Sequence, residues 1–391
     1  MLETTCNKND ATLASTQQLN NSTIDNDTSR RITSLRFLLI VLVVFIHNCY
    51  TSQSIQQIID NGGTAPLFVE NTFGRWIKLF ITFGIARGSV PLFFMFSAFL
   101  QAKKDDNYKT LLRKRSKSLL LPFIIWNAIY VFYFGGLKLL VAKIAPQLVG
   151  HPENNFFAWT ISEWIHNLVG YVPDGNGGLK LPSLAVQFWF IRDLIILVFI
   201  SPVLKCLIKK FPISFLFFVS AIYVIPVQLY FIVSQALFFY VVGLYWGYYN
   251  ISLFEVVDKI SWKETFFFYL LTFIYTYKLG NGDNSTEHYF MVICSCVILL
   301  KLSALIVKYK KLYTICSYLS GFSFFLFAIH CPVLNSLVSN YWIRFFPMKN
   351  TFFCLLQYFL PTVLVIIIGT TIGIILRKIC LPLFKVLNGG R

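Results

Sequence analysis

Arg36 and His47 are residues whose types and spacing could carry chemistry. They stand about three helical turns apart, so on a helix they would share one face, with a rise of about 16 Å between them. An arginine binds phosphate, and a neutral imidazole accepts a proton near neutral pH. The pair therefore suits a reaction in which a donor is held by its phosphate and reacts beside an imidazole further along. Alternatively, Arg36 only flanks an apolar segment and His47 forms a hydrogen bond within a helix bundle.

Other ionisable residues also fall within or at the ends of apolar stretches: Arg87, Arg192, Asp193, Lys301 and His330. A charged side chain inside a membrane costs about 2.5–3.5 kcal/mol on insertion scales, so each is a candidate for function. Of the 17 acidic residues, Asp193 alone lies well within such a stretch, which argues against a proton-coupled transporter and excludes a paired-carboxylate hydrolase. A histidine is then the best general base.

The composition places these residues in a membrane. Of the 391 residues, 56% are hydrophobic and 13% are charged, whereas a soluble domain has about 25% charged residues. The apolar runs are continuous and recur from residue 35 onward, which predicts membrane helices and excludes an alternating β-barrel pattern. We therefore expect an all-α polytopic bundle.

The apolar runs predict about ten spans. They cover residues 33–50, 77–101, 119–139, 186–204, 213–230, 231–249, 265–277, 289–307, 312–338 and 353–376, with a turn at Pro226. An even number places both termini on one side. Most Lys and Arg residues lie in the loops on that side, so we expect both termini to be cytoplasmic, in a multi-pass protein of a bacterial cytoplasmic membrane. The net charge of +17 then reflects orientation in the membrane rather than nucleic-acid binding.

The remaining segments suggest one domain with a tail. Residues 1–30 are polar and are expected to form a disordered cytoplasmic tail, ahead of a transmembrane domain over 31–391. The nine cysteines show no ligand spacing, so neither a disulfide framework nor a metal site is expected. Two long outer segments, 51–76 and 141–184, could cover an acceptor site.

Several phrases resemble a known family when they are taken in order. They are Arg36-x10-His47; Gly88-Ser-Val-Pro-Leu-Phe-Phe-Met-Phe-Ser97-Ala-Phe-Leu100; the basic loop leading into Leu119-Leu-Leu-Pro122-Phe-Ile-Ile-Trp126-Asn127; Phe188-Trp-Phe-Ile-Arg192-Asp193-Leu; Ser201-Pro202; and Ser323-Phe-Phe-Leu-Phe-Ala-Ile-His330-Cys-Pro332. Over about residues 30 to 391 the chain resembles the acyltransferase-3 family of membrane O-acyltransferases. It departs from the family at Ala98, where glycine is usual, and at Lys117, where a second arginine is usual.

The resemblance implies transfer of an acyl group, most often acetyl from cytoplasmic acetyl-CoA, to a hydroxyl of an extracytoplasmic polysaccharide or lipid-linked sugar. It suggests these roles: His47 as base, with His330 as second choice; Arg87 or Arg192 at the oxyanion, Arg192 being oriented or masked by Asp193; and Arg36, Arg113, Arg115 and Lys117 at the coenzyme A phosphates. Coenzyme A is then a donor substrate, no metal is needed, and the partners are a carbohydrate and membrane lipid.

Three alternatives remain open. Ser97 could act as an acyl-enzyme nucleophile, although small residues in spans usually serve packing. A sugar-lipid transporter or flippase could share the ten spans, but it should show internal repeats, and none are seen. An inactive partner in a polysaccharide-assembly complex is disfavoured by the intact Arg36, His47 and Arg87.

Overall fold

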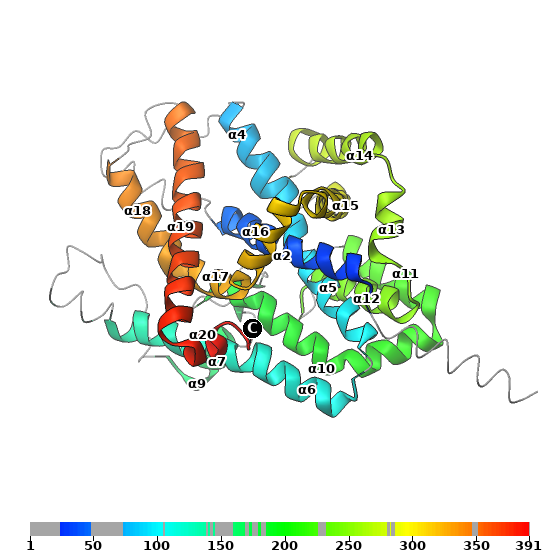
Figure 1. Cartoon of the computed structure of the whole chain (residues 1–391), viewed down its shortest axis with the longest axis horizontal. Coiled ribbons are helices and arrows are strands. Elements are labelled where there is room, and N and C mark those ends of the chain that lie inside the picture. The colour runs from blue at the N-terminus through cyan, green and yellow to red at the C-terminus, as the bar shows by residue number, and fades with distance from the viewer. Residues whose placement is uncertain are drawn as a thin grey trace, which may run out of the picture.

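The chain folds into a bundle of helices (Figure 1). The computed structural model describes residues 24–47, 73–104, 106–137, 140, 144, 159–168, 172–173, 179–180, 185–225, 232–279, 282, 286–345 and 351–390. Within them, strands are confined to the short antiparallel pair β1 (Val172–Pro173) and β2 (Leu179–Lys180). The predicted helical fold class is therefore confirmed.

Most helices of the first half follow the predicted apolar runs. They are α2 (Asn26–His47); α4 (Phe73–Lys78), which continues through η1 (Leu79–Gly84) and η2 (Ile85–Gly88) into α5 (Ser89–Lys103); α6 (Tyr108–Arg115), η3 (Ser116–Leu120), α7 (Leu121–Phe132) and η4 (Tyr133–Leu137); α9 (Ile161–Leu168); and η7 (Val186–Phe188) with α10 (Trp189–Lys210). Helix α6 lies instead in the predicted basic loop, and α9 lies in the predicted outer segment 141–184. Because α2 already begins at Asn26, the tail expected over residues 1–30 ends earlier than predicted, and residues 1–23 lie outside the described chain.

The second half is more broken. It comprises α11 (Pro212–Val224), α12 (Ser234–Tyr248), α13 (Leu253–Asp258), α14 (Trp262–Ile274) with η8 (Tyr275–Leu279), α15 (Thr286–Lys308), α16 (Lys310–Ser320), α17 (Ser323–Ile329) with η10 (His330–Leu334), α18 (Asn335–Phe345), α19 (Thr351–Ile379) and α20 (Leu381–Leu387). The turn predicted at Pro226 lies outside the described residues.

The count of ten spans is not confirmed. Among the described residues, four helical stretches are long and apolar enough to cross a membrane: Phe73–Lys103, Tyr108–Leu137, Thr286–Lys308 and Leu355–Ile379. A fifth is possible if Lys310–Ser320 and Ser323–Ser339, bent by 55° at their junction, form one broken span. The run predicted as one helix over 312–338 is therefore interrupted, and α11, α12 and α14 have only 13, 15 and 13 residues.

Helix α2 lies in the middle of the bundle (Figure 1). It packs against α5, α15, α16, α17 and α19, and its residues Leu35, Leu39 and Val44 are fully buried. Because α2 carries both Arg36 and His47, its neighbours determine what these two side chains can reach.

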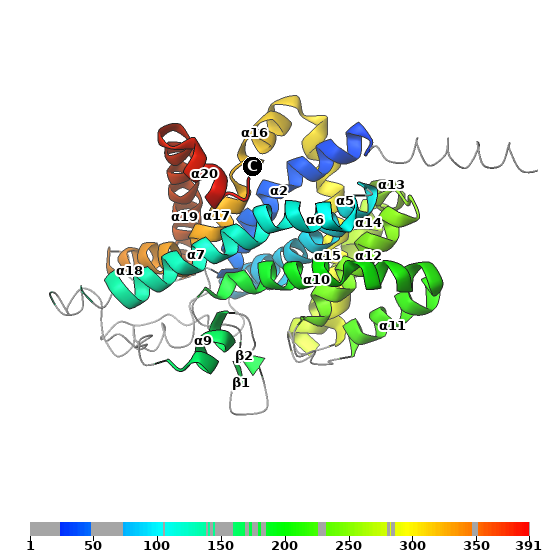
Figure 2. The same ribbon diagram turned by 90° about the horizontal axis from the view of Figure 1, so that it is seen from below.

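Close helix packing supports the wall formed by α5 and α12. A Cβ atom on Gly243 would lie 2.3 Å from the backbone oxygen of Met95, so only glycine lets the two helices approach this closely. Helices α6, α7 and α10 run alongside each other over one side of the bundle (Figures 1 and 2). Large apolar side chains face outward elsewhere, including Phe132, Ile213, Phe217 and Ile367. Such exposure is typical of a surface in contact with lipid.

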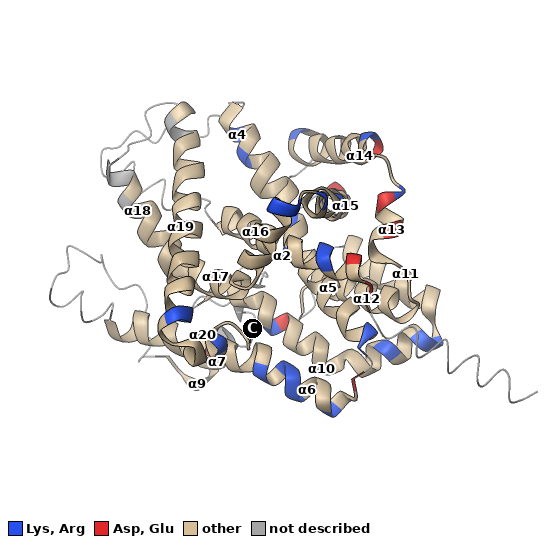
Figure 3. Cartoon of the chain, in the orientation of Figure 1, with Lys and Arg blue, Asp and Glu red and all other residues tan. Residues whose placement is uncertain are grey.

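Lys and Arg gather on α6 and on the neighbouring end of α10 (Figure 3). The phenol of Tyr108, at the start of α6, donates to the backbone oxygen of Phe199 on α10 at 2.7 Å, which ties the two helices together. The basic loop expected before the third span is therefore helical itself and is joined to α7 through the π-turn η3.

Candidate active site

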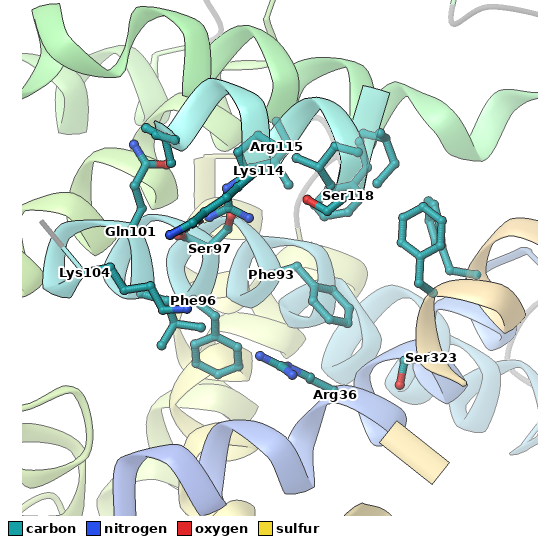
Figure 4. Close-up of a pocket in the computed structure, with 18 of the residues that line it drawn as sticks. Arg36, Phe93, Phe96, Ser97, Gln101, Lys104, Lys114, Arg115, Ser118 and Ser323 are labelled. Atoms are coloured by element: carbon teal, nitrogen blue, oxygen red, sulfur yellow. Dashed lines mark hydrogen bonds between the residues drawn. The ribbon is translucent and has the colours of Figure 1, made fainter. Parts of the chain in front are cut away.

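A pocket of about 370 Å³ lies between α2, α5, the α6–η3 segment, α10 and α17. Figure 4 shows it with cationic side chains from three of these segments around it: Arg36 from α2, Lys104 beyond the end of α5, and Lys114 and Arg115 from α6. A pocket with several cations suits an anionic ligand, and phosphate in particular.

Arg36 is one of two pocket cations, with the exposed Lys104, that have no hydrogen bond or ion pair among the described residues. The side chain of Arg36 is half-buried. A partly desolvated guanidinium without a carboxylate is costly unless a ligand supplies the charge. Arg115, also half-buried, donates to the backbone oxygen of Ser97 at 3.4 Å. Lys114 pairs with Asp106 at 2.7 Å.

The four predicted phosphate-binding residues do not all reach the pocket. Arg36 and Arg115 line it, whereas Arg113 and Lys117 are exposed on α6 and η3 and are not among its lining residues. Lys104 and Lys114 line it instead. Sequence reasoning missed them because position within a basic segment does not tell which face of α6 turns toward α2.

Aromatic rings and hydroxyl groups also line the pocket. Phe93, Phe190 and Phe327 line it, and so do Ser97 and Ser323. Neither serine Oγ has a hydrogen-bond partner within the described part of the chain. Ser97 thus has no base beside it, while both hydroxyls remain able to bind a polar ligand.

The second feature of the site is a pair of histidines. The rings of His47, at the end of α2, and His330, at the start of η10, lie 5.1 Å apart between centroids. His330 is fully buried and its Nδ1 lies 2.7 Å from the backbone oxygen of Phe327. Because a carbonyl oxygen only accepts, Nδ1 carries the proton of the neutral ring and Nε2 keeps a lone pair. This Nε2 has no hydrogen-bond partner among the described residues.

Phe327 connects the pocket to the histidine pair. Its ring lines the pocket, and its centroid lies 6.1 Å from that of His330. Neither histidine lines the pocket itself. The site therefore has a cationic chamber at one end and two imidazoles further along the same helices, with aromatic side chains between them.

Other polar contacts hold the two histidine-bearing helices. Asn335 on α18 donates to the backbone oxygen of His47 at 2.5 Å. Arg87, on η2, lies close enough to His47 to act on it electrostatically and rests 5.0 Å from the ring centroid of Phe83. The structure thus brings Arg87, His47 and His330 into one region. Asn335 was not predicted, because an asparagine close to a helix start gives no signal of its distant partner.

Arg192 and Asp193 lie apart from this region and bind each other. Nε and Nη2 of Arg192 donate to Oδ1 of Asp193 at 2.9 and 2.5 Å, and Oδ2 accepts from the backbone N–H of Val233 at 2.9 Å. Both side chains are almost completely buried, and neither lines the pocket. The arrangement corresponds to the masked alternative considered for Arg192, and it ties α10 to the start of α12.

No group of three or more His, Cys, Asp or Glu side chains in the described ranges could hold a metal ion. Six cysteines are free thiols: Cys206, Cys294, Cys296, Cys316, Cys331 and Cys380.

Comparison with known proteins shows the family of the chain. The family model for the acyltransferase domain matches residues 30–378. The succinoglycan biosynthesis protein ExoH of Rhizobium meliloti (strain 1021) is 24% identical over 253 residues, which cover 61% of this chain and 59% of that protein. The alignment thus spans less than two thirds of that relative's length. No solved structure matches the chain. Since the family match extends over most of the chain and includes Arg36, His47 and His330, this protein belongs to the acyltransferase-3 family of membrane acyltransferases.

Proposed function

We propose that this protein transfers an acyl group, in particular acetyl, from acyl-CoA to a hydroxyl group of a carbohydrate. The observation that carries the proposal is the position of Arg36, a pocket cation without a protein partner in the described structure, on the same helix as His47. The two residues are about three helical turns apart, a rise of about 16 Å. A donor anchored by its phosphates at Arg36 can extend its thioester toward the histidines.

The cations around the pocket fit the donor. Coenzyme A carries several phosphate groups, and Arg36, Arg115, Lys104 and Lys114 can neutralise them. The aromatic rings of Phe93, Phe190 and Phe327 in the pocket suit the less polar arm that joins the phosphates to the sulfur. The Lys and Arg residues on α6 and α10 support a cytoplasmic mouth for this pocket, because basic segments favour that side of a membrane.

The reaction follows from the residues at the inner end. His47 removes the proton from the acceptor hydroxyl as the oxygen attacks the thioester carbonyl, and a tetrahedral oxyanion forms. Arg87 lies in the same region as His47, so its positive charge can stabilise this oxyanion. The carbon–sulfur bond then breaks, the ester remains on the acceptor, and coenzyme A leaves as the thiol with the proton that His47 had taken.

Direct transfer is favoured over an acyl-enzyme relay. Ser97 lines the pocket, but its hydroxyl has no hydrogen-bond partner in the described chain, so no base there activates it as a nucleophile. The carbohydrate acceptor is supported by the ExoH relative, whose name assigns it to succinoglycan biosynthesis. The acceptor is thus proposed to be a polysaccharide or a lipid-linked sugar precursor.

The test is transfer of label from radioactive acetyl-CoA. Purified wild type and a His47→Ala variant are incubated with the donor alone and then with mixed cell-envelope glycans. Label should reach glycan only with wild type, while both proteins bind the donor. Failure of wild type to bind acetyl-CoA would contradict the proposal, and label that stays on the protein would indicate a covalent relay.

A further inference from the structure

The start of α17 carries a buried hydroxyl that the proposed reaction does not yet use. Ser323 is 3% exposed, lines the pocket, and leaves its Oγ without a hydrogen-bond partner among the described residues. A buried hydroxyl that makes no hydrogen bond costs about 1–3 kcal/mol, so such groups usually have a function or a missing partner.

Ser323 and Arg36 both line the pocket, and Figure 4 shows the Ser323 hydroxyl on the side where the Arg36 side chain leaves α2, while the guanidinium extends toward Phe96. Helices α2 and α17, which carry the two residues, pack against each other. A guanidinium and a hydroxyl that line the same pocket from two packed helices, neither with a protein partner in the described structure, can donate to different oxygen atoms of one phosphate group bound between them. The opposite side of the pocket has its own cations, Lys114 and Arg115, for a second phosphate.

The turn before Ser323 is held by a residue far along the chain. Asn388, fully buried after α20, accepts through Oδ1 from the backbone N–H of Phe325 at 3.0 Å and donates through Nδ2 to the backbone oxygen of Gly321 at 2.8 Å. These two bonds bracket Ser323 on either side. They fix the backbone of the turn and thereby the position of the Ser323 hydroxyl.

The segment that carries Asn388 is itself firmly held. The indole N–H of Trp126 on α7 donates to the backbone oxygen of Leu387 at 3.0 Å. Gly389 has a φ of +72°, and a Cβ there would lie 2.6 Å from the backbone oxygen of Ser118, a residue that lines the pocket. Only glycine fits this position without strain. The segment after α20 therefore supports the pocket wall from behind.

We propose that Ser323 and Arg36 form one phosphate subsite for the donor, and that Asn388 is the positioning residue of that subsite. This inference rests on the proposed function, because it takes the pocket to be the acyl-CoA site. The Ser323 hydroxyl donates to the phosphate that Arg36 neutralises, and Asn388 acts only through the turn that it fixes.

The experiment measures binding of labelled acetyl-CoA and transfer from S-acetylpantetheine, a donor that lacks phosphate. Ser323→Ala should weaken acetyl-CoA binding about tenfold, since a hydrogen bond to a charged group is worth roughly that factor or more. Ser323→Thr keeps the hydroxyl and should bind close to wild type. Transfer from S-acetylpantetheine should be the same in all three proteins, because it has no phosphate for Ser323 to bind.

Asn388→Ala tests the positioning role through a double-mutant cycle. It should weaken acetyl-CoA binding without lowering kcat at saturating donor, and Asn388→Ala combined with Ser323→Ala should be no weaker than the weaker single variant. If Asn388→Ala does not fold, Asn388→Asp, which keeps the acceptor for the Phe325 N–H, replaces it. The matched control is Asn127→Ala, because among the described residues this buried asparagine bonds only to Phe123, within its own helix α7.

Two results would overturn the subsite. Unchanged acetyl-CoA binding by Ser323→Ala would show that the Ser323 hydroxyl does not bind the donor. Equal losses with acetyl-CoA and S-acetylpantetheine, or additive losses in the double variant, would mean that these residues only stabilise the fold. A wrong assignment of the whole donor site would give a different result, because the wild-type protein itself would then not bind acetyl-CoA.

Discussion

The imidazole rings of His47 and His330 lie 5.1 Å apart, although α2 and η10 are far apart in the sequence. His330 is fixed by its bond to the backbone oxygen of Phe327, and His47 is held through its own backbone by Asn335. Two imidazoles at this distance can share one proton transfer, with one acting as base and the other orienting it or the substrate. The geometry therefore gives different expectations for the two residues.

Replacing His47 with alanine should lower the transfer rate by about 10²–10⁴-fold, the usual contribution of a positioned general base. Donor affinity should not change, because His47 does not line the pocket. Turnover and acetyl-CoA binding are measured on the same preparation. His288→Gln, on α15 beside Tyr289, is the control for loss of a buried histidine outside the site. Turnover by His47→Ala near the wild-type rate would move the base to His330.

The contribution of His330 to kcat should depend on the lone pair of its Nε2 atom rather than on the size of its side chain alone. The amide of an asparagine can replace Nδ1–H toward Phe327, but it offers nothing at Nε2, whereas a glutamine reaches the Nε2 position. We expect His330→Asn to lose at least about tenfold in kcat and His330→Gln to retain more activity. Equal rates for the two variants, with thermal stability matched to wild type, would show that the Nε2 lone pair is not used.

Arg36→Ala and Arg115→Ala should each raise the KM for acetyl-CoA about tenfold, because a hydrogen bond to a charged group is worth roughly that factor. The effect should shrink at high salt, where exposed charges are screened. Arg113→Ala is the matched control, since Arg113 is exposed on the same helix as Arg115 and does not line the pocket. A KM increase for Arg113→Ala equal to that for Arg115→Ala would mean that α6 acts through its overall charge instead.

The sequence was sufficient to predict the helical fold class and the relations between residues on the same helix. Arg36 and His47 share a helix, so their relation follows from helical geometry alone. The pairing of His47 with His330, and the choice of Lys114 and Arg115 over Arg113 and Lys117, depend on how distant helices are rotated against one another. Hydrophobic periodicity carries little of that information in a chain that is apolar on most faces.

The span count was harder to predict for a related reason. Apolar length predicts a span, but it does not show where a helix bends. The run over 312–338 contains Gly321 and Phe322, which form a turn there, and Asn388 bonds to that turn from outside the run. The closing Asn388-Gly-Gly-Arg391 belongs to the family resemblance, but the contacts of Asn388 could not be predicted from local sequence, because its two partners lie 63 and 67 residues earlier.

Substitutions at Arg192 and Asp193 should lower the thermal stability of the protein more than they affect the transfer reaction directly. Removing one partner of a buried ion pair leaves an uncompensated charge and typically costs about 3–5 kcal/mol, whereas replacing both with neutral residues costs less. Arg192→Met should therefore unfold at a lower temperature in detergent than the double variant Arg192→Met, Asp193→Asn. If Arg192→Met is as stable as wild type, binds acetyl-CoA normally and has lost transfer, then Arg192 rather than Arg87 stabilises the oxyanion.

Asp258 bonds to Arg31 near the start of α2, and this contact should make the stability of the protein depend on pH. Arg31 donates to Oδ2 and Oδ1 of Asp258 at 2.5 and 2.9 Å, and its guanidinium lies 4.0 Å from the ring centroid of Phe254. The hydrogen bond from Arg31 holds the pKa of Asp258 below its ordinary value. The pKa of this carboxyl is thus lower in the folded than in the unfolded protein, so it contributes stability above the unfolded pKa of about 3.9.

This stabilisation is lost as the pH falls through the folded pKa of Asp258, and it is fully present at neutral pH. Asp258→Asn should therefore lower the melting temperature at pH 6 and bring it closer to the wild-type value at pH 3, as followed by thermal unfolding in detergent across that range. Glu287→Gln, outside this contact, controls for the loss of a carboxylate. Since Arg31 lies just over one helical turn before Arg36, Asp258→Asn should also raise the KM for acetyl-CoA at pH 6. Melting curves of Asp258→Asn and wild type that remain parallel from pH 6 to pH 3 would contradict a role for this ion pair in holding α2.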